Sequence, residues 1–139
     1  MRQLSGACIV EDMCIRMDPA GDGNYHASRD DGHKRHSGID YQCEVGAGIF
    51  SPVAGKVTKH GHAYPNDNQY RYVQITDDEG LDHRIYYCLP GAPLGKMVTT
   101  DTVIGISQDI SRRYPGELMK PHIHYEVMDS AGDYRNPAK

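Results

Sequence analysis

Residues 120–127 read KPHIHYEV, a run in which polar and apolar side chains alternate. Because successive side chains of a strand point to opposite faces, His122, His124 and Glu126 share one face and the apolar residues between them share the other. The apolar face is suited to a core. The polar face has two interpretations: an exposed surface, or a site where one imidazole binds a metal ion while the other moves protons.

Similar short runs fill the chain from Gly48 onward, at 48–60, 70–76, 83–89, 102–108 and 122–128. They are rich in β-branched and aromatic residues and are separated by turn residues, which is typical of strands. TDDEGLD at 76–82 is expected to form a hairpin turn, and LPGAPLGK at 89–96 a second connection. Residues 1–35 lack this periodicity and are dense in Gly and Asp. The sequence therefore predicts a mostly β fold with a loop-rich N-terminal segment.

Composition limits the architecture and the partners. The chain has 139 residues, 38% hydrophobic content and a net charge of −4 at pH 7. This length suits one compact domain, spanning 1–139. Basic side chains form no block, so neither nucleic acid nor an anionic membrane is expected as a partner. No apolar run approaches the roughly 20 residues that span a bilayer, and no signal peptide is visible, so membrane insertion is not expected.

A second motif, HSGIDY at 36–41, adds ligand-type residues. His36 and Asp40 lie four apart and so return to the same face of either a strand or a helix, while Gly38 disfavours a helix interior. Together with His122 or His124 they supply two imidazoles and one carboxylate. This set suits zinc with an open fourth position. Taken alone, the motif also fits a local hydrogen bond at a turn.

These motifs resemble those of the lysostaphin/LytM-type zinc endopeptidases in order and approximate spacing: HSGIDY, SPVAGKV, VQI, TVIG and HIHYEV. Residues 21–40 and 113–124 also resemble the leukocyte cell-derived chemotaxins within that superfamily, which extends the resemblance to nearly the whole chain. The resemblance implies that His36, Asp40 and His124 bind one zinc ion, and that His122 is the general base of a peptidase. It also implies an antiparallel duplicated hybrid motif with a cleft.

One position departs from the enzyme pattern. Active lysostaphin-type enzymes carry a Tyr-x-His-Leu pattern whose histidine helps to stabilise the transition state, whereas this chain reads YYCL, with Cys88 at that position. A thiol is a weak hydrogen-bond donor and a poor replacement for an imidazole. Cys88 is expected to be a buried small residue or a disulfide partner, and Cys88→His is expected to raise any activity.

Two functions follow from the resemblance. The first is a zinc metallopeptidase that acts on cross-linking peptides of peptidoglycan, weakened because Cys88 replaces a histidine. The alternative is a catalytically inactive, chemotaxin-like extracellular protein that retains zinc and binds a receptor or a glycan. Both imply an extracytoplasmic location, either secreted or virion-associated.

The four cysteines allow three complete pairings, and the residues alone do not choose among them. The chemotaxin resemblance aligns Cys8 and Cys43 with a bonded pair, which leaves Cys14 and Cys88 as a second pair. A Cys8–Cys43 bond would tie the N-terminal segment beside the metal loop, and it would imply an oxidising destination.

The other histidines lie among turn residues or at the ends of expected strands and are expected to be exposed: His26, His33, His60, His62 and His83. The segment HAYPNDNQYRY at 62–72 suggests one wall of a cleft. There Tyr64, Asn66 and Tyr70 would offer hydrogen bonds to a peptide.

Overall fold

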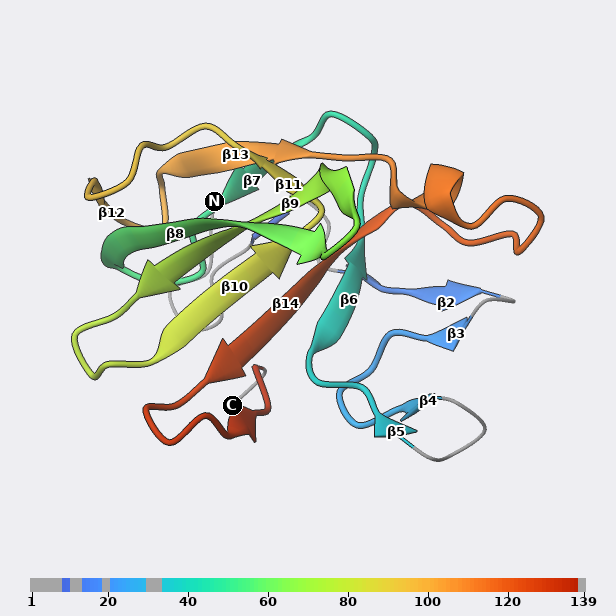
Figure 1. The fold of residues 1–139 in the computed structure, drawn as a ribbon, viewed down its shortest axis with the longest axis horizontal. Helices are drawn as coiled ribbons and strands as arrows, with labels where there is room; N and C mark the ends of the chain where they lie inside the picture. Colours follow the sequence, from blue (N-terminus) through green and yellow to red (C-terminus); the bar gives the residue numbers. More distant parts are fainter. Residues whose placement is uncertain (1–8, 11–13, 19–20, 30–33, 138–139) are drawn as a thin grey trace.

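The computed structural model describes residues 9–10, 14–18, 21–29 and 34–137. Within these ranges the regular elements are strands, apart from one short 3-10 helix, as Figure 1 shows. The elements are β1 (Cys14–Ile15), β2 (Met17–Asp18), β3 (Gly21–Asp22), β4 (Ser28–Arg29), β5 (Lys34–Arg35), β6 (Ile39–Gln42), β7 (Gly48–Phe50), β8 (Gly55–Tyr64), β9 (Asp67–Thr76), β10 (Asp82–Tyr86), β11 (Cys88–Pro90), β12 (Met97–Val98), β13 (Val103–Ser107), η2 (Ile110–Arg113), β14 (His122–Met128) and β15 (Tyr134–Arg135).

Two sheets make up the body of the fold. The large sheet has the order β1-β6-β14-β10-β9-β8-β12, with β15 added beside β14, and the small sheet has the order β11-β13-β7. The described strand pairs are antiparallel. In Figure 1 the small sheet lies next to β8 and β9 of the large sheet, and β11 contacts β9. The predicted mostly β, antiparallel lysostaphin/LytM-like fold is confirmed.

The predicted runs hold, but two of them are divided between the sheets. The run at 48–60 separates into β7 and β8 around Pro52, and the run at 83–89 separates into β10 and β11 at Tyr87. The predicted hairpin between β9 and β10 is present, with Gly80 at φ 81° and its N–H donating to the carbonyl of Asp77. Glycine is favoured at such a positive φ because it has no Cβ to clash.

The core lies between the two sheets and takes its apolar side chains from both. Ile49 and Ile104 come from the small sheet, and Val73, Ile85 and Ile123 come from the large one; each of the five is 0% exposed. Ile123 belongs to the apolar face that the alternation in 120–127 predicts, so that face is confirmed. Burying such side chains contributes roughly 1.5–3 kcal/mol each, before the loss of chain entropy is counted.

The HSGIDY motif needs a glycine at position 38 because there is no room there for a side chain. A Cβ at this position would lie 2.2 Å from the carbonyl oxygen of Tyr125 and 2.8 Å from its carbonyl carbon. Any other residue would therefore push the loop before β6 away from β14. The close approach of these two segments is what brings residues 36–40 beside the end of the KPHIHYEV strand.

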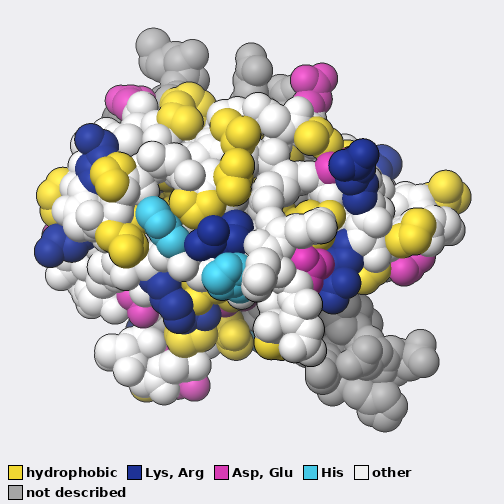
Figure 2. Space-filling model, turned by 45° about the horizontal axis from the view of Figure 1, so that its top comes forward, with side chains coloured by type: hydrophobic (Ala, Val, Ile, Leu, Met, Phe, Trp, Pro, Cys, Tyr) yellow, Lys and Arg dark blue, Asp and Glu magenta, His cyan; other side chains and the backbone are white. Residues whose placement is uncertain are grey.

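The cysteines form no bond within the described part of the chain. Cys43 and Cys88 are free thiols in this structure, so neither the pairing that the resemblance implies for Cys43 nor the pairing left over for Cys88 is formed here. Cys8 and the side chain of Cys14, the expected partners, lie outside the described residues. Within the described ranges no helix is long and apolar enough to cross a membrane. On the face seen in Figure 2, basic, acidic and apolar side chains are interspersed.

Candidate metal centre

The strand register places one polar row across the large sheet. Asp40 on β6 lies opposite His124 on β14, and His124 lies opposite Tyr86 on β10. Residues that face one another across neighbouring strands have side chains on the same face. The row therefore points away from the core, toward the face on which the loop before β6 passes.

His36 joins this row from the loop between β5 and β6. Its Nε2 atom lies 3.0 Å from Nδ1 of His124 and 3.1 Å from Oδ1 of Asp40, and those two atoms are 2.9 Å apart. The three side chains are almost fully buried, at 8%, 3% and 9% exposed for His36, Asp40 and His124. Three potential ligand atoms, separated by up to 88 positions in sequence, thus meet at one point.

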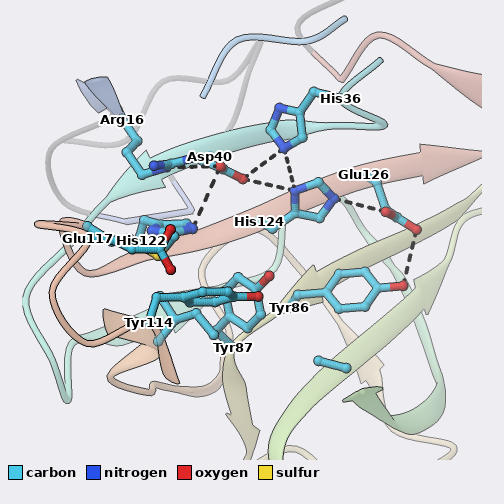
Figure 3. Close-up of a pocket in the computed structure, with 13 residues that line it drawn as sticks. Arg16, His36, Asp40, Tyr86, Tyr87, Tyr114, Glu117, His122, His124 and Glu126 are labelled. Atoms are coloured by element: carbon cyan, nitrogen blue, oxygen red, sulfur yellow. Dashed lines mark hydrogen bonds and ion pairs between the residues drawn. The ribbon is translucent and has the colours of Figure 1, made fainter. Parts of the chain in front are cut away.

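The second nitrogen of each imidazole is anchored. Nδ1 of His36 donates to the carbonyl of Asn24 at 2.9 Å, and Nε2 of His124 lies 2.9 Å from Oε1 of Glu126. Glu126 is itself held, because Ser37 donates to one of its oxygens and Tyr86 donates to the other. Figure 3 shows these contacts as a continuous series of dashed lines that runs from His36 through His124 and Glu126 to Tyr86. Such partners fix ring orientation and tautomer in metal sites.

Asp40 is the most heavily contacted carboxylate of the site. Arg16 donates from Nε to Oδ2 of Asp40 at 3.1 Å, and its NH1 group donates to Asp18 at 2.8 Å. Burial alone would raise the pKa of Asp40. Hydrogen bonds with His124 and His36, and then the charges of His124 and His122, outweigh burial and hold that pKa well below its usual value. Asp40 is therefore an anion at neutral pH. Sequence reasoning missed Arg16, which lies in the irregular N-terminal segment.

The pKa of His124 shifts in the opposite direction, upward. Burial alone would lower the pKa of His124, but hydrogen bonds to Asp40 and Glu126 together with their negative charges raise it to about 9. Burial likewise raises the pKa of Glu126, and its contacts, led by His124, reverse this and lower it. His124 would have to release a proton to bind a divalent cation, since metal ligands bind in their deprotonated form.

His122 stands two residues before His124 and faces the same cavity with a different geometry. Its Nδ1 lies 2.8 Å from the carbonyl of Lys120 and therefore carries the hydrogen that is donated to it. Its Nε2 lies 3.7 Å from Oδ2 of Asp40. Burial is the largest influence and lowers the pKa of His122, so the ring is neutral with Nε2 unprotonated at neutral pH. This tautomer is the one that can accept a proton at Nε2.

The donor set fits zinc. Two imidazole nitrogens and one carboxylate oxygen are ligands that zinc accepts, and four-coordinate bonds of 2.0–2.1 Å put neighbouring ligand atoms about 3.3 Å apart. The observed separations of 2.9–3.1 Å are close to that spacing. A small outward movement of the three side chains would admit the ion.

The donors open onto a cavity of about 600 Å³. Its lining includes His36, Asp40 and His124 together with His122, and it also includes the aromatic and acidic side chains of Tyr86, Tyr87, Tyr114, Glu117 and Glu126. A pocket of this size can hold several residues of a peptide, since small-ligand sites span about 300–1,000 Å³. The site therefore combines a ligand set, a separate imidazole base and room for a substrate.

The model of peptidase family M23 matches residues 34–137, more than half of the chain. The chain belongs to peptidase family M23. It is also 28% identical to leukocyte cell-derived chemotaxin-2 of Mus musculus over 114 residues, which cover 82% of this chain and 72% of the mouse protein. The bovine (Bos taurus) protein is 28% identical over 112 residues, which cover 81% of this chain and 71% of the bovine protein.

Several solved structures share the fold. A mutant of the catalytic domain of the prophage-encoded M23 protein EnpA from Enterococcus faecalis superposes with a TM-score of 0.63 at 19% identity, covering 91% of this chain and 96% of that one. A zinc-containing peptidase from Vibrio cholerae superposes with a TM-score of 0.64 at 19% identity, covering 94% of this chain and 38% of that one. The solution structure of lysostaphin superposes with a TM-score of 0.61 at 18% identity. The match covers 78% of this chain and only 43% of the lysostaphin chain.

The M23 resemblance placed a functional position at Cys88, and the structure places that side chain elsewhere. Cys88 is 0% exposed and packs in the core against Gly105, where an added Cβ would lie 2.6 Å from its Sγ atom. Burial raises the pKa of the Cys88 thiol to about 12. The thiol is thus a buried small side chain, which is one of the two roles expected of it. A histidine at this position would enter the core, so the expected gain of activity from Cys88→His has no structural basis.

Three expectations about other side chains need correction, those for His83, Tyr70 and His60. His83 is 5% exposed rather than solvent-facing, because its Nε2 donates to Asp77 and its Nδ1 accepts from the Tyr125 hydroxyl, both at 2.8 Å. Tyr70 is 6% exposed and lies behind the cavity wall, where its hydroxyl donates to the carbonyl of Asp109. The remaining histidines divide as follows: His26 and His62 are exposed as expected, His60 is half-buried, and His33 lies outside the described residues.

Proposed function

We propose that this M23 chain is a zinc-dependent peptidase domain that hydrolyses short cross-linking peptides of peptidoglycan. The observation that carries the proposal is the convergence of His36, Asp40 and His124 beside a separate base, His122, at the wall of one open cavity. A buried structural zinc site would more often be closed by four protein ligands. Three ligands beside a cavity leave a position for a reacting molecule.

Nε2 of His36, Oδ1 of Asp40 and Nδ1 of His124 would hold the single zinc ion. When bound, zinc supplies a Lewis acid. The chain contributes the geometry: the Asn24 carbonyl and Glu126 fix the two imidazoles, and Arg16 holds the second oxygen of Asp40. These contacts keep the donor atoms in place without the ion, so little reorganisation accompanies binding.

His122 would move the proton during hydrolysis. Its Nδ1–H is held by the Lys120 carbonyl, so Nε2, which lies 3.7 Å from Oδ2 of Asp40 in a residue that lines the cavity, keeps its lone pair. Nε2 accepts a proton from the attacking water as oxygen adds to the peptide carbonyl carbon. The same proton passes to the leaving nitrogen as the C–N bond breaks, and His122 returns to its neutral state. General base catalysis of this kind contributes about 100- to 10,000-fold in rate.

A peptidoglycan substrate fits the family and the cavity, and the bonds to be cut would be glycyl or D-amino-acid peptide bonds. Because peptidoglycan lies outside the cytoplasmic membrane, the proposal places the chain in an extracytoplasmic setting, secreted or carried by a virion. The solved lysostaphin and EnpA structures, which share this fold, support the choice of a peptidase over other hydrolases.

The test is to incubate zinc-loaded protein with purified peptidoglycan and to count newly released amino groups. The wild type and a His62→Ala control, whose histidine is exposed on β8, should both release amines. His122→Ala should lose about 100- to 10,000-fold of that rate while keeping its zinc. Cleavage that survives His122→Ala would overturn the assigned mechanism.

A second candidate is a zinc-retaining, non-catalytic protein that binds a receptor or a glycan. Its support is the 28% identity to chemotaxin-2 over most of both chains, together with the burial of Cys88 away from the cavity. The same experiment separates the two. Wild-type protein with full zinc occupancy that releases no amines from peptidoglycan would favour this second function.

A further inference from the structure

Tyr87 is the residue at which the chain leaves the large sheet and enters the small one. It lies between β10 and β11 with φ 65°, a left-handed backbone that side chains other than glycine rarely adopt. Both of its peptide groups are held: its N–H donates to the Arg71 carbonyl and its carbonyl accepts from the N–H of Gln108, each at 2.8 Å. Strained residues that the surroundings hold in this way cluster at functional sites.

This backbone conformation changes which side chains reach the cavity. In a regular strand Tyr86 and Cys88 would share a face and Tyr87 would point away. Instead Tyr86 and Tyr87 both line the cavity, while Cys88 turns into the core. The phenol of Tyr87 therefore stands in the cavity wall next to the position where the sequence pattern expects an imidazole.

The ring of Tyr87 packs against the ring of His122, the proposed general base. It meets the ring of His122 edge-to-face, with centroids 5.5 Å apart and an interplanar angle of 89°. Figure 3 shows Tyr87 and Tyr114 on the side of the cavity that faces His122 and His124. The Tyr87 hydroxyl lies 3.5 Å from that of Tyr64, a long contact, and Tyr64 is 2.8 Å from the Tyr114 hydroxyl.

The hydroxyl of Tyr87 is a donor at neutral pH. Burial, and after it the neighbouring Tyr64, raises the pKa of Tyr87 well above its usual value. A protonated phenol whose hydroxyl makes a long contact can redirect its hydrogen toward an acceptor in the cavity without losing a strong bond. Such a preset donor is what stabilises charge that develops on a carbonyl oxygen during acyl transfer.

We propose that Tyr87 is a catalytic residue of this domain, whose hydroxyl donates a hydrogen bond to the carbonyl oxygen of the scissile peptide bond. The inference rests on the proposed peptidase function and assigns to Tyr87 the stabilising role that the family pattern gives to the residue at position 88. Tyr87 keeps its proton throughout, since it donates a hydrogen bond while His122 carries the transferred proton.

The test compares Tyr87→Phe with Tyr70→Phe in the zinc-loaded 139-residue chain. Tyr70 is a matched control because its ring packs edge-on against Tyr87, yet its hydroxyl donates to the Asp109 carbonyl outside the cavity. The probes are phosphinate pseudo-peptides, in which a tetrahedral phosphorus carries the charge of the transition state, with a glycyl or a D-alanyl residue before it. Binding is measured by calorimetry, and release of amines from peptidoglycan is measured in parallel.

Tyr87→Phe should lower amine release about 100- to 1,000-fold, as for loss of one oxyanion donor. It should also weaken phosphinate binding about tenfold or more, as for loss of one hydrogen bond to a charged group. Zinc content and unfolding temperature should match the wild type, and Tyr70→Phe should retain both binding and rate. Unchanged phosphinate binding in Tyr87→Phe would overturn the inference, and so would a loss that follows lost zinc. A zinc-loaded wild type that neither binds the probes nor releases amines would overturn the proposed function and this inference with it.

Discussion

The two faces of β14 differ in what surrounds them and hardly at all in how deeply they are buried. The polar face is 3%, 9% and 3% exposed at His122, His124 and Glu126, and the apolar face is 0%, 7% and 5% exposed at Ile123, Tyr125 and Val127. The apolar face packs into the hydrophobic core, to which both sheets contribute side chains. The polar face is covered by the loop before β6 and by Arg16, and it opens onto the cavity.

The comparison teaches that burial alone does not separate a core from a site. A buried polar group without partners costs free energy, so such groups in native proteins nearly always have their hydrogen bonds satisfied. On β14 each polar side chain has named partners: the Lys120 carbonyl for His122, Asp40 for His124, and Ser37 with Tyr86 for Glu126. The following changes test one face against the other.

The largest effect is expected from His124→Ala on the polar face. This change removes a proposed ligand atom and leaves both Asp40 and Glu126 buried without its imidazole. We expect loss of stoichiometric zinc and a marked fall in the unfolding temperature, because ligand binding to the native state contributes to stability. Metal analysis and thermal unfolding measure the two effects, with His62→Ala as the control. Full zinc occupancy in His124→Ala would reject this residue as a ligand.

Ile123→Ala tests the opposite face one residue away. Ile123 is 0% exposed, so the substitution should destabilise the protein by about 2–5 kcal/mol through lost burial and a residual cavity. Zinc binding by the remaining folded protein should be unchanged. Denaturant unfolding gives the stability, and Val103→Ala, at 49% exposed, is the control. A loss of zinc affinity in folded Ile123→Ala would show that the two faces are coupled.

Cys88→His extends the test to the core beneath the cavity. An imidazole in place of the buried thiol should cost roughly 1–3 kcal/mol, because it overfills the space beside Gly105 and buries a polar ring. Amine release from peptidoglycan should fall or stay the same. Cys88→Ala, which adds no volume, is the control. A rise in activity with unchanged stability would mean that position 88 reaches the cavity after all.

The smallest effect is expected from Glu126→Gln. The amide keeps the shape of the carboxylate but loses the charge that holds Nε2 of His124. Loss of such an outer partner lowers metal affinity by about 10- to 100-fold, while the three ligands remain. Competition with a chelating dye measures the affinity. Equal zinc affinity in the variant would show that Glu126 serves only the packing of Tyr86 and Ser37.

Much of the site could be predicted because it depends on local periodicity. Alternation in 122–128 puts two imidazoles and an acid on one face of a strand, and the spacing in HSGIDY returns His36 and Asp40 to one side. The convergence of these two motifs followed from the family resemblance, and the separations of 2.9–3.1 Å in the structure agree with it. The roles of His36, Asp40, His124 and His122 stay predictions until metal and activity are measured.

Other features depend on backbone geometry that local sequence does not encode. Alternation through 83–89 would put Cys88 on the same face as Tyr86, but a single residue at φ 65° sends Tyr87 to the cavity and Cys88 to the core. His83 looked like an exposed strand-end histidine. It is buried because Asp77 and Tyr125 meet it from a turn and from another strand.

The sequence by itself determined the strand-rich class, the two faces of β14 and the chemical types at the site, since these follow from side-chain period and donor chemistry. The tertiary structure alone decided that Arg16 clamps Asp40, that Glu126 orients His124, and that Tyr87 faces His122. The physical reason differs between the three contacts. Arg16 and Asp40 are distant in sequence, and Tyr87 reaches His122 only because the strand periodicity breaks at position 87. Glu126 orients His124 because Ser37 and Tyr86, from other segments, hold its carboxylate. The geometry of each contact is set by how the sheets pack, and no residue pattern within one segment carries that information.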